Sequence, residues 1–157
     1  MRRDGESSRA LLSVRRDPDS VIDGLLVVDR AENLAAVDQR EERYRRVSLT
    51  PSDLELSAET RHAGCSLYVY EASADQASVR LEIIQSYLDA VLQGFLREYG
   101  RAGVERFVRE TEGFDATVIA DRKTPGYPRA VRLEADEEAY FDALIMQKFS
   151  YFAPFVR

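Results

Sequence analysis

The sequence predicts an α+β fold, because strand-like segments come first along the chain and helical segments later, with one helix inserted early. Residues 65–70 alternate in character with a period of two, as in a strand, whereas apolar residues between 81 and 100 recur at helical spacing. The length of 157 residues suits one domain, which we expect over residues 10–157, behind a disordered tail at residues 1–9.

Composition and charge exclude several classes of function. There are 28 acidic and 22 basic residues, the net charge is -6, and the basic residues are scattered, which argues against a nucleic-acid-binding surface. A single cysteine, Cys65, forms no internal disulfide, and with one histidine, His62, the usual zinc-ligand sets are not available. We therefore expect no metal and no cofactor, and we read the pair as a buried thiol and a surface imidazole.

The hydropathy of the sequence indicates the cellular location that we expect for the protein. No apolar run approaches the roughly 20 residues of a membrane span, and the first residues, MRRDGESSR, lack the apolar core of a secretory signal. We expect a cytoplasmic protein that does not contact a membrane.

The first quarter of the chain predicts two strands. Residues 10–14 form a candidate strand, residues 17–20 a turn, and residues 24–28 a second strand that is apolar on both faces, as a central strand would be. These two strands would form a hairpin or lie near each other.

The segment 33–47 places one acid, Glu41, on the apolar side of a short helix. Leu34 and Val37 are three positions apart and line one helical face, and Glu41 lies four positions beyond Val37 on that face. The helical spacing then fails, and residues 44–49 are typical of a strand. This junction would direct Glu41 toward whatever the strand packs against.

The second half of the chain is mainly helical. The helical stripe over residues 81–100 ends at a glycine suited to a left-handed C-terminal stop, and a shorter helix stops near Gly113. Residues 121–129 form a loop that could bind an anion, although an ordinary exposed turn is the simpler reading. A last helix opens at the acids 136–138, and the aromatic tail 149–155 would pack on the domain or on a second copy.

Three short motifs carry a resemblance to a known family. They are Val-Asp-Gln-Arg-Glu at 37–41 with Tyr44 downstream, Ser-Tyr at 86–87 opening the long helix, and Asp-Gly-Leu-Leu at 23–26. Together they resemble the γ-glutamylcyclotransferase-like family, and the match runs from about Ala10 to Leu144. Three further stretches are similar to a bacterial branch of that family: 85–100, 109–114 and 127–129.

The resemblance implies a mixed β-sheet or barrel with flanking helices, and an enzyme that cyclises a small γ-glutamyl amine or peptide to 5-oxoproline. It implies Glu41 as the catalytic acid/base and Tyr87 as a substrate contact, with Tyr68 as a second, weaker candidate. The chain lacks the family's Tyr-Gly-Ser-Leu loop, which holds the substrate, and Glu42 stands where relatives often have glycine.

Each of these residues also has a simpler interpretation. Spacing alone predicts that Glu41 is a solvated acid in the charged run 40–43. It predicts that Tyr87 is an aromatic residue at the edge of the core and that Tyr68 packs on a face of the sheet. The alternative function is accordingly a non-catalytic binding or structural module of the same fold. A start after the family's first strand would leave a sheet edge unpaired, which favours a homodimer.

Overall fold

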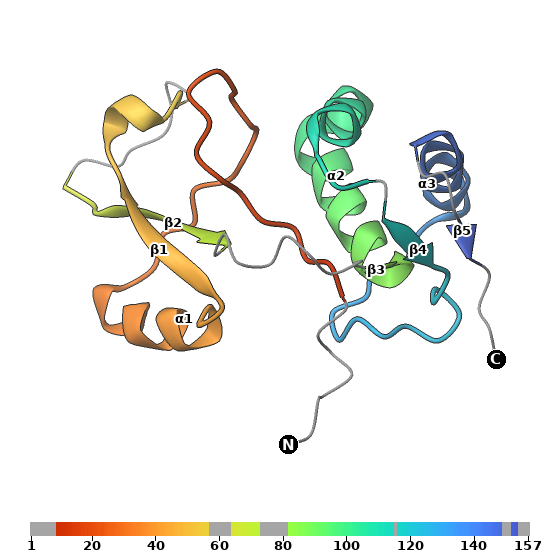
Figure 1. The fold of residues 1–157 in the computed structure, drawn as a ribbon, viewed down its shortest axis with the longest axis horizontal. Coiled ribbons are helices and arrows are strands. Elements are labelled where there is room, and N and C mark those ends of the chain that lie inside the picture. Colours follow the sequence, from red (N-terminus) through yellow and green to blue (C-terminus); the bar gives the residue numbers. More distant parts are fainter. Residues whose placement is uncertain (1–8, 57–63, 73–81, 115, 149–151, 154–157) are drawn as a thin grey trace. The chain divides into compact units, whose positions relative to one another are not determined.

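The computed structural model describes residues 9–56, 64–72, 82–114, 116–148 and 152–153. The chain is α+β, as predicted, and its contacts divide it into two compact units (Figure 1). One unit is Leu12–Ala77, and the other combines Met1–Leu11 with Ser78–Arg157. The described strands form two separate small sheets, one in each unit. The expectation of a single domain over 10–157 stays a prediction.

The Leu12–Ala77 unit is built on an antiparallel strand pair. Its elements in chain order are η1 (Ala31–Asn33), α1 (Leu34–Arg40), β1 (Tyr44–Leu49), η2 (Pro51–Asp53) and β2 (Leu67–Ala72). Strand β1 has the bounds that the sequence predicts, while β2 starts and ends two residues later than predicted. The register pairs Tyr44 with Ala72 and Leu49 with Leu67.

This pairing gives the two-stranded sheet two different faces, because successive side chains of a strand point to opposite sides. Arg46 pairs with Tyr70 and Ser48 with Tyr68, so these four share one face. The opposite face carries the aliphatic residues of both strands, all of them half-buried: Val47, Leu49, Leu67 and Val69. The sheet is therefore polar and aromatic on one side and aliphatic on the other.

The two strands predicted at 10–14 and 24–28 are not formed, and these predictions are wrong. The first segment contributes only an isolated bridge, from Val14 to Glu71. In the second, Val27 is 87% exposed and Val28 83%, the opposite of a central strand. A continuous apolar run is typical of a strand that other elements cover on both faces. Such a run does not by itself determine whether those covering elements are present.

The other unit holds a parallel sheet that the sequence did not reveal. Its elements in chain order are β3 (Glu82–Ile84), α2 (Gln85–Glu110), β4 (Thr117–Ile119), α3 (Ala135–Lys148) and β5 (Phe152–Ala153). The strand order is β3-β4-β5 with both pairs parallel, so each neighbouring pair is joined through a helix. Strands and helices therefore alternate within this unit, unlike the order of strands first and helices later that the sequence predicts.

Helix α2 is interrupted where the sequence predicts a stop. Gly100 has φ 63° and ψ -168°, which breaks the helical path before a second segment continues to Glu110. The predicted beginning is less accurate, because Ile84 belongs to β3 rather than to the helix. Helix α3 begins at Ala135, with acids in its first turn as predicted.

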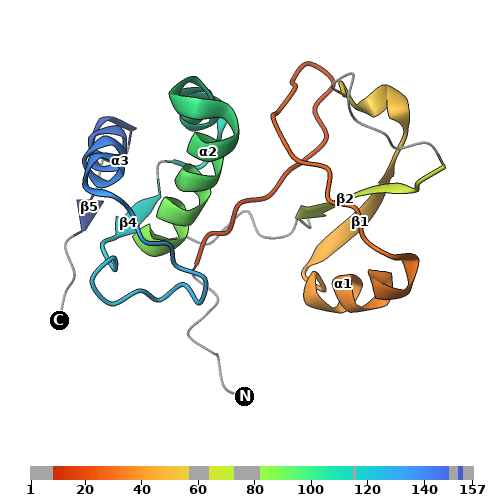
Figure 2. The ribbon, with the colours of Figure 1, turned by 180° about the vertical axis from the view of Figure 1, so that it is seen from behind.

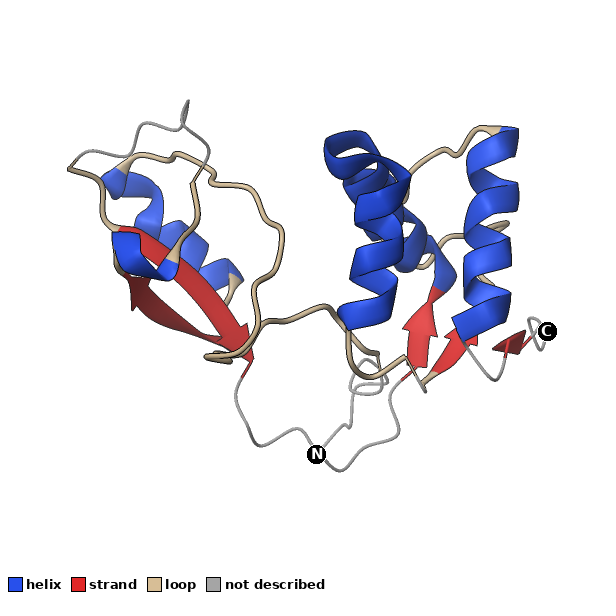
Figure 3. Cartoon of the chain, turned by 90° about the horizontal axis from the view of Figure 1, so that it is seen from above, coloured by secondary structure: helices blue, strands red, loops and turns tan. Residues whose placement is uncertain are grey.

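The hydrophobic core lies in this second unit. Helices α2 and α3 lie side by side (Figures 2 and 3), and the residues least exposed to solvent come from both helices and from β4. The most deeply buried are Phe141, Leu92, Ile145, Val104 and Val118. In the described part of Leu12–Ala77, by contrast, the only buried side chain is that of Glu71.

Candidate functional site

Helix α1 presents one half-buried stripe made of Leu34, Val37, Asp38 and Glu41, as the spacing predicts. Glu41 is the C-cap residue of the helix: its N–H donates to the carbonyl of Val37 at 2.9 Å, and its own carbonyl accepts the N–H of Tyr44 at 2.8 Å. The backbone thus turns directly from the helix into β1. The side chain of Glu41, at this turn, is half-buried.

The carboxylate of Glu41 is partly covered and ion-paired. Its Oε1 accepts a hydrogen bond from Nε of Arg40 at 2.9 Å, and the side chain of Glu41 is 28% exposed while that of Arg40 is 67% exposed. An ion pair with so exposed a partner is weak and exchanges readily with water. Glu41 therefore remains reachable by a small molecule.

Tyr44 begins β1 three residues after Glu41 and is half-buried. Its burial raises the pKa of the Tyr44 hydroxyl, the negative charge of Glu41 raises it further, and Arg43 acts in the opposite direction. Tyr44 is thus a neutral hydrogen-bonding group close to the acid.

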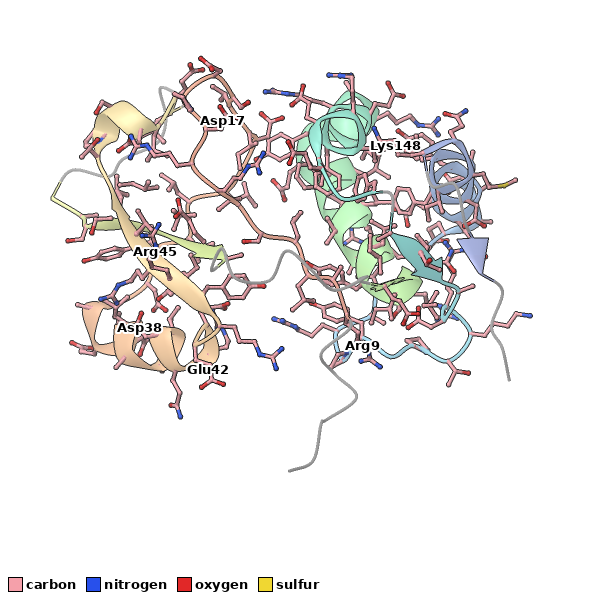
Figure 4. All side chains as sticks on the ribbon, viewed as in Figure 1. Arg9, Asp17, Asp38, Glu42, Arg45 and Lys148 are labelled. Carbon is pink, nitrogen blue, oxygen red and sulfur yellow. The ribbon has the colours of Figure 1, made fainter. Side chains whose placement is uncertain are left out.

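A second acid, Asp38, lies on α1 (Figure 4) and hydrogen-bonds to both strands. Its Oδ1 accepts the hydroxyl of Tyr70 at 2.7 Å, and its Oδ2 accepts a guanidinium N–H of Arg46 at 2.6 Å. The guanidinium of Arg46 also lies 4.9 Å from the centre of the Tyr68 ring. Desolvation raises the pKa of Tyr70, and the hydrogen bond to Asp38 and the charge of Asp38 raise it further. Sequence reasoning missed this cluster, although Asp38 lies on the same stripe as Glu41.

The opposite face of the same strands carries an independent ion pair. Arg45 donates to a carboxylate oxygen of Glu71 at 2.8 Å, and the side chain of Glu71 is 12% exposed. This pair joins β1 to β2 directly, whereas on the other face Asp38 bridges the two strands from α1 through Arg46 and Tyr70.

The sequence-predicted site residues fall in different units. Glu41 and Tyr68 belong to Leu12–Ala77, whereas Tyr87 belongs to the other unit. Tyr87 is half-buried in the first turn of α2, where its ring meets that of Tyr127 edge-on at 5.1 Å. Tyr68 is 39% exposed and contacts Arg46. Tyr68 is thus connected with Asp38 through Arg46, whereas Tyr87 contacts Tyr127.

A polar cluster at the carboxyl ends of β3 and β4 was also missed from the sequence. Asp121, 4% exposed, accepts the N–H of Ser86 at 2.7 Å, its hydroxyl at 2.6 Å, and the N–H of Gly126 at 2.8 Å. The Ser86 hydroxyl in turn accepts the N–H of Tyr127 at 3.2 Å. Asp121 thereby fills the N-terminus of α2 with the protein's own carboxylate, where an external anion would otherwise bind.

The neighbouring Arg122 is held by three carboxylates, from Asp89, Asp142 and Glu138. Hydrogen bonds to Asp89 and Asp142 raise the pKa of its guanidinium against the opposing effect of burial. Burial is the main cause that raises the pKa of Asp89, and the pairing with Arg122 opposes it. Arg122 is thus already neutralised by the protein, while the other cations of this loop, Lys123 and Arg129, are exposed, as in a surface turn.

The remaining expectations concern the cysteine, the histidine and membranes. Cys65 is exposed, so its prediction as a buried thiol is wrong, and His62 lies outside the described residues. Across the described ranges, none of the helices has the length and apolar character needed to cross a bilayer.

Comparison of this chain with protein-family models, with curated proteins and with solved structures finds no match.

Proposed function

We propose that this chain is a γ-glutamylcyclotransferase-like enzyme that converts a small γ-glutamyl amine or peptide to 5-oxoproline, with Glu41 as the general acid/base. The observation that carries the proposal is the position of Glu41: a partly exposed carboxylate on the inward face of α1, where the helix turns into β1. The proposal includes the mixed-sheet fold that the family resemblance implies. An exposed, free Cys65 suits a reducing cytoplasm.

The reaction needs two proton transfers at one place. The substrate's α-amino nitrogen attacks the γ-carbonyl carbon, forming the ring C–N bond, and the original amide C–N bond then breaks. Glu41 takes the proton from the attacking nitrogen and gives it to the leaving nitrogen, so a single carboxylate is regenerated in each cycle. Such positioned proton transfer contributes about 10²- to 10⁴-fold.

The rest of the rate enhancement comes from holding the substrate in a folded conformation, because nucleophile and electrophile belong to one molecule. Tyr68, which belongs to the same unit as Glu41, is the proposed hydrogen-bond donor to the substrate, and Tyr87 is assigned to that role by the family resemblance alone. Tyr44 is a further neutral hydroxyl-bearing residue near the acid.

The test is a turnover assay on a γ-glutamyl dipeptide, with 5-oxoproline quantified by mass spectrometry. Glu41→Gln keeps the shape of the side chain and removes its ability to accept a proton, so we expect turnover to fall by at least about 100-fold. Glu42→Gln is the matched control, because Glu42 is the adjacent, exposed acid, and it should retain activity. Full turnover by Glu41→Gln would overturn the assignment.

The second candidate is a non-catalytic module of the same fold. The hydrogen bond from Arg40 to Glu41 favours it, since one carboxylate oxygen of Glu41 already has a partner within the protein. In that case no turnover is expected, and millimolar γ-glutamyl dipeptide should leave the melting temperature unchanged. A clear rise in melting temperature would count against the structural version of this candidate.

A further inference from the structure

The carboxylate of Asp38 connects three elements. One oxygen accepts the Tyr70 hydroxyl from β2, and the other accepts the Arg46 guanidinium from β1, while Asp38 itself lies on α1. In the part of the chain that the structure describes, all side-chain hydrogen bonds from α1 to the sheet pass through Asp38. Both distances, 2.7 and 2.6 Å, are those of charge-assisted bonds.

Helix α1 needs such a connection because little else holds it. It has only 7 residues, none of them buried, and its N-cap residue makes no side-chain capping bond. Helices shorter than about 12 residues are marginal in water unless tertiary contacts stabilise them. The orientation of α1 on the sheet therefore depends strongly on Asp38.

Glu41 shares that orientation. It lies three positions after Asp38, on the same stripe of the helix, so the two side chains are neighbours. Asp38 also neutralises Arg46, whose side chain is 33% exposed. Loss of the Asp38 carboxylate would release the end of α1 that carries Glu41 and would remove this partner of Arg46.

We infer that Asp38 is the positioning residue for Glu41: it fixes the end of α1 against β1 and β2, and thereby the C-cap residue that carries the Glu41 carboxylate. This inference rests on the proposed function for its catalytic meaning. Asp38 does not contact the substrate, and its effect on turnover is exerted through Glu41.

The experiment compares Asp38→Asn with Glu71→Gln in the full chain. Each variant removes one carboxylate charge that pairs with an arginine of β1, on opposite faces of the same strands. We expect Asp38→Asn to lower kcat by about 10- to 100-fold, since a small displacement of a catalytic group has effects of that size, with KM nearly unchanged. Glu71→Gln should keep the wild-type kcat, and Asp38→Glu should restore part of it.

An Asp38→Asn enzyme with the kcat of Glu71→Gln would overturn the inference, because both variants weaken the strand pair. A loss of kcat that Asp38→Glu does not partly restore would do the same. Cooperative thermal melting of all three variants shows that the comparison is made on folded protein.

A readout that does not need turnover separates this inference from the proposed function. Modification of the Glu41 carboxylate by a water-soluble carbodiimide and an amine is followed by peptide mass spectrometry. The rate of modification should change in Asp38→Asn and not in Glu71→Gln. If the wild type makes no 5-oxoproline, the proposed function fails, and the modification rates still decide whether Asp38 positions Glu41: equal rates in wild type and Asp38→Asn would refute it.

Discussion

The carboxylate of Asp121 accepts both the backbone N–H and the hydroxyl of Ser86, at 2.7 and 2.6 Å, although 35 positions separate the two residues. One residue follows the end of β4 and the other opens α2. This pair therefore joins the carboxyl end of one parallel strand to the helix that leaves its neighbour. It caps α2 from outside the local sequence.

Replacing Asp121 with alanine should destabilise the protein by several kcal/mol, because each buried donor left without an acceptor costs about 1–3 kcal/mol. Urea unfolding followed by circular dichroism measures the loss. Asp53→Ala is the control: Asp53 accepts the N–H and hydroxyl of Thr50 in a similar local cap, but at an exposed position. A loss for Asp121→Ala no greater than that for Asp53→Ala would contradict the prediction.

Two glycines of α2 should respond oppositely to alanine. Gly100 has φ 63° and ψ -168°, a region that is essentially restricted to glycine, so Gly100→Ala should cost about 1–3 kcal/mol. Gly94 lies within the helix, and an added Cβ there meets no atom within 4 Å, so Gly94→Ala should gain about 0.4–1 kcal/mol through a less flexible unfolded chain. Chemical denaturation of both variants provides the measurement, and changes of the same sign would refute this account of Gly100.

Asp89 should make stability fall as pH rises. Its folded-state pKa is raised above the model-peptide value of 3.8, chiefly by burial, so the folded state binds more protons than the unfolded state as the pH rises through and above 3.8. The slope of the unfolding free energy is therefore negative in that window. Asp89→Asn removes this contribution, so its stability relative to wild type should increase with pH. Melting temperatures of the two proteins from about pH 3 to 7 test the sign, and a stability of Asp89→Asn that falls relative to wild type as the pH rises would contradict it.

Core and surface aliphatic residues should differ sharply. Leu92 is 1% exposed on α2, and Leu92→Ala should cost about 2–5 kcal/mol through lost burial and the cavity that remains. Val27 is 87% exposed, and Val27→Ala should change stability by no more than about 0.5 kcal/mol. Urea unfolding of both variants tests this difference, and a large loss for Val27→Ala would show that this side chain is covered in solution.

The elements that the sequence predicted well carry a strong local signal. Strand β1 was predicted with its observed bounds because helical spacing fails at Tyr44 and a proline follows at position 51. Gly100 marks a break because only glycine adopts its backbone angles easily. Helix α3 follows from three acids in its first turn.

The missed elements depend on distant partners. Strand β3 has three residues and β5 two, too few to show a period of two, and their pairing with β4 becomes visible only when the helices between them are in place. Conversely, residues 24–28 have the composition of a central strand and form none. Composition indicates what a segment could bury but does not provide its neighbours.

The candidate site shows the same division. The inward position of Glu41 follows from its spacing after Val37, and the structure agrees. Predicting the hydrogen bonds that Asp38 accepts from Arg46 and Tyr70 would have required the register of the two strands, which local sequence does not specify. The available signal in the sequence was the spacing of Asp38 on the helix and Arg46 on the next strand, an acid and a cation eight positions apart.

Few side chains are buried in the described part of Leu12–Ala77, so the stability of this unit should depend on the salt concentration. This unit is held in part by charge pairs on partly exposed side chains, including Asp38 with Arg46 and Arg45 with Glu71. Counterions screen such pairs, with a Debye length of about 10 Å at 0.1 M salt and about 3 Å at 1 M. Raising the salt concentration should therefore speed amide hydrogen exchange in β1 and β2 while α2 and α3, which pack around an aliphatic and aromatic core, keep their protection.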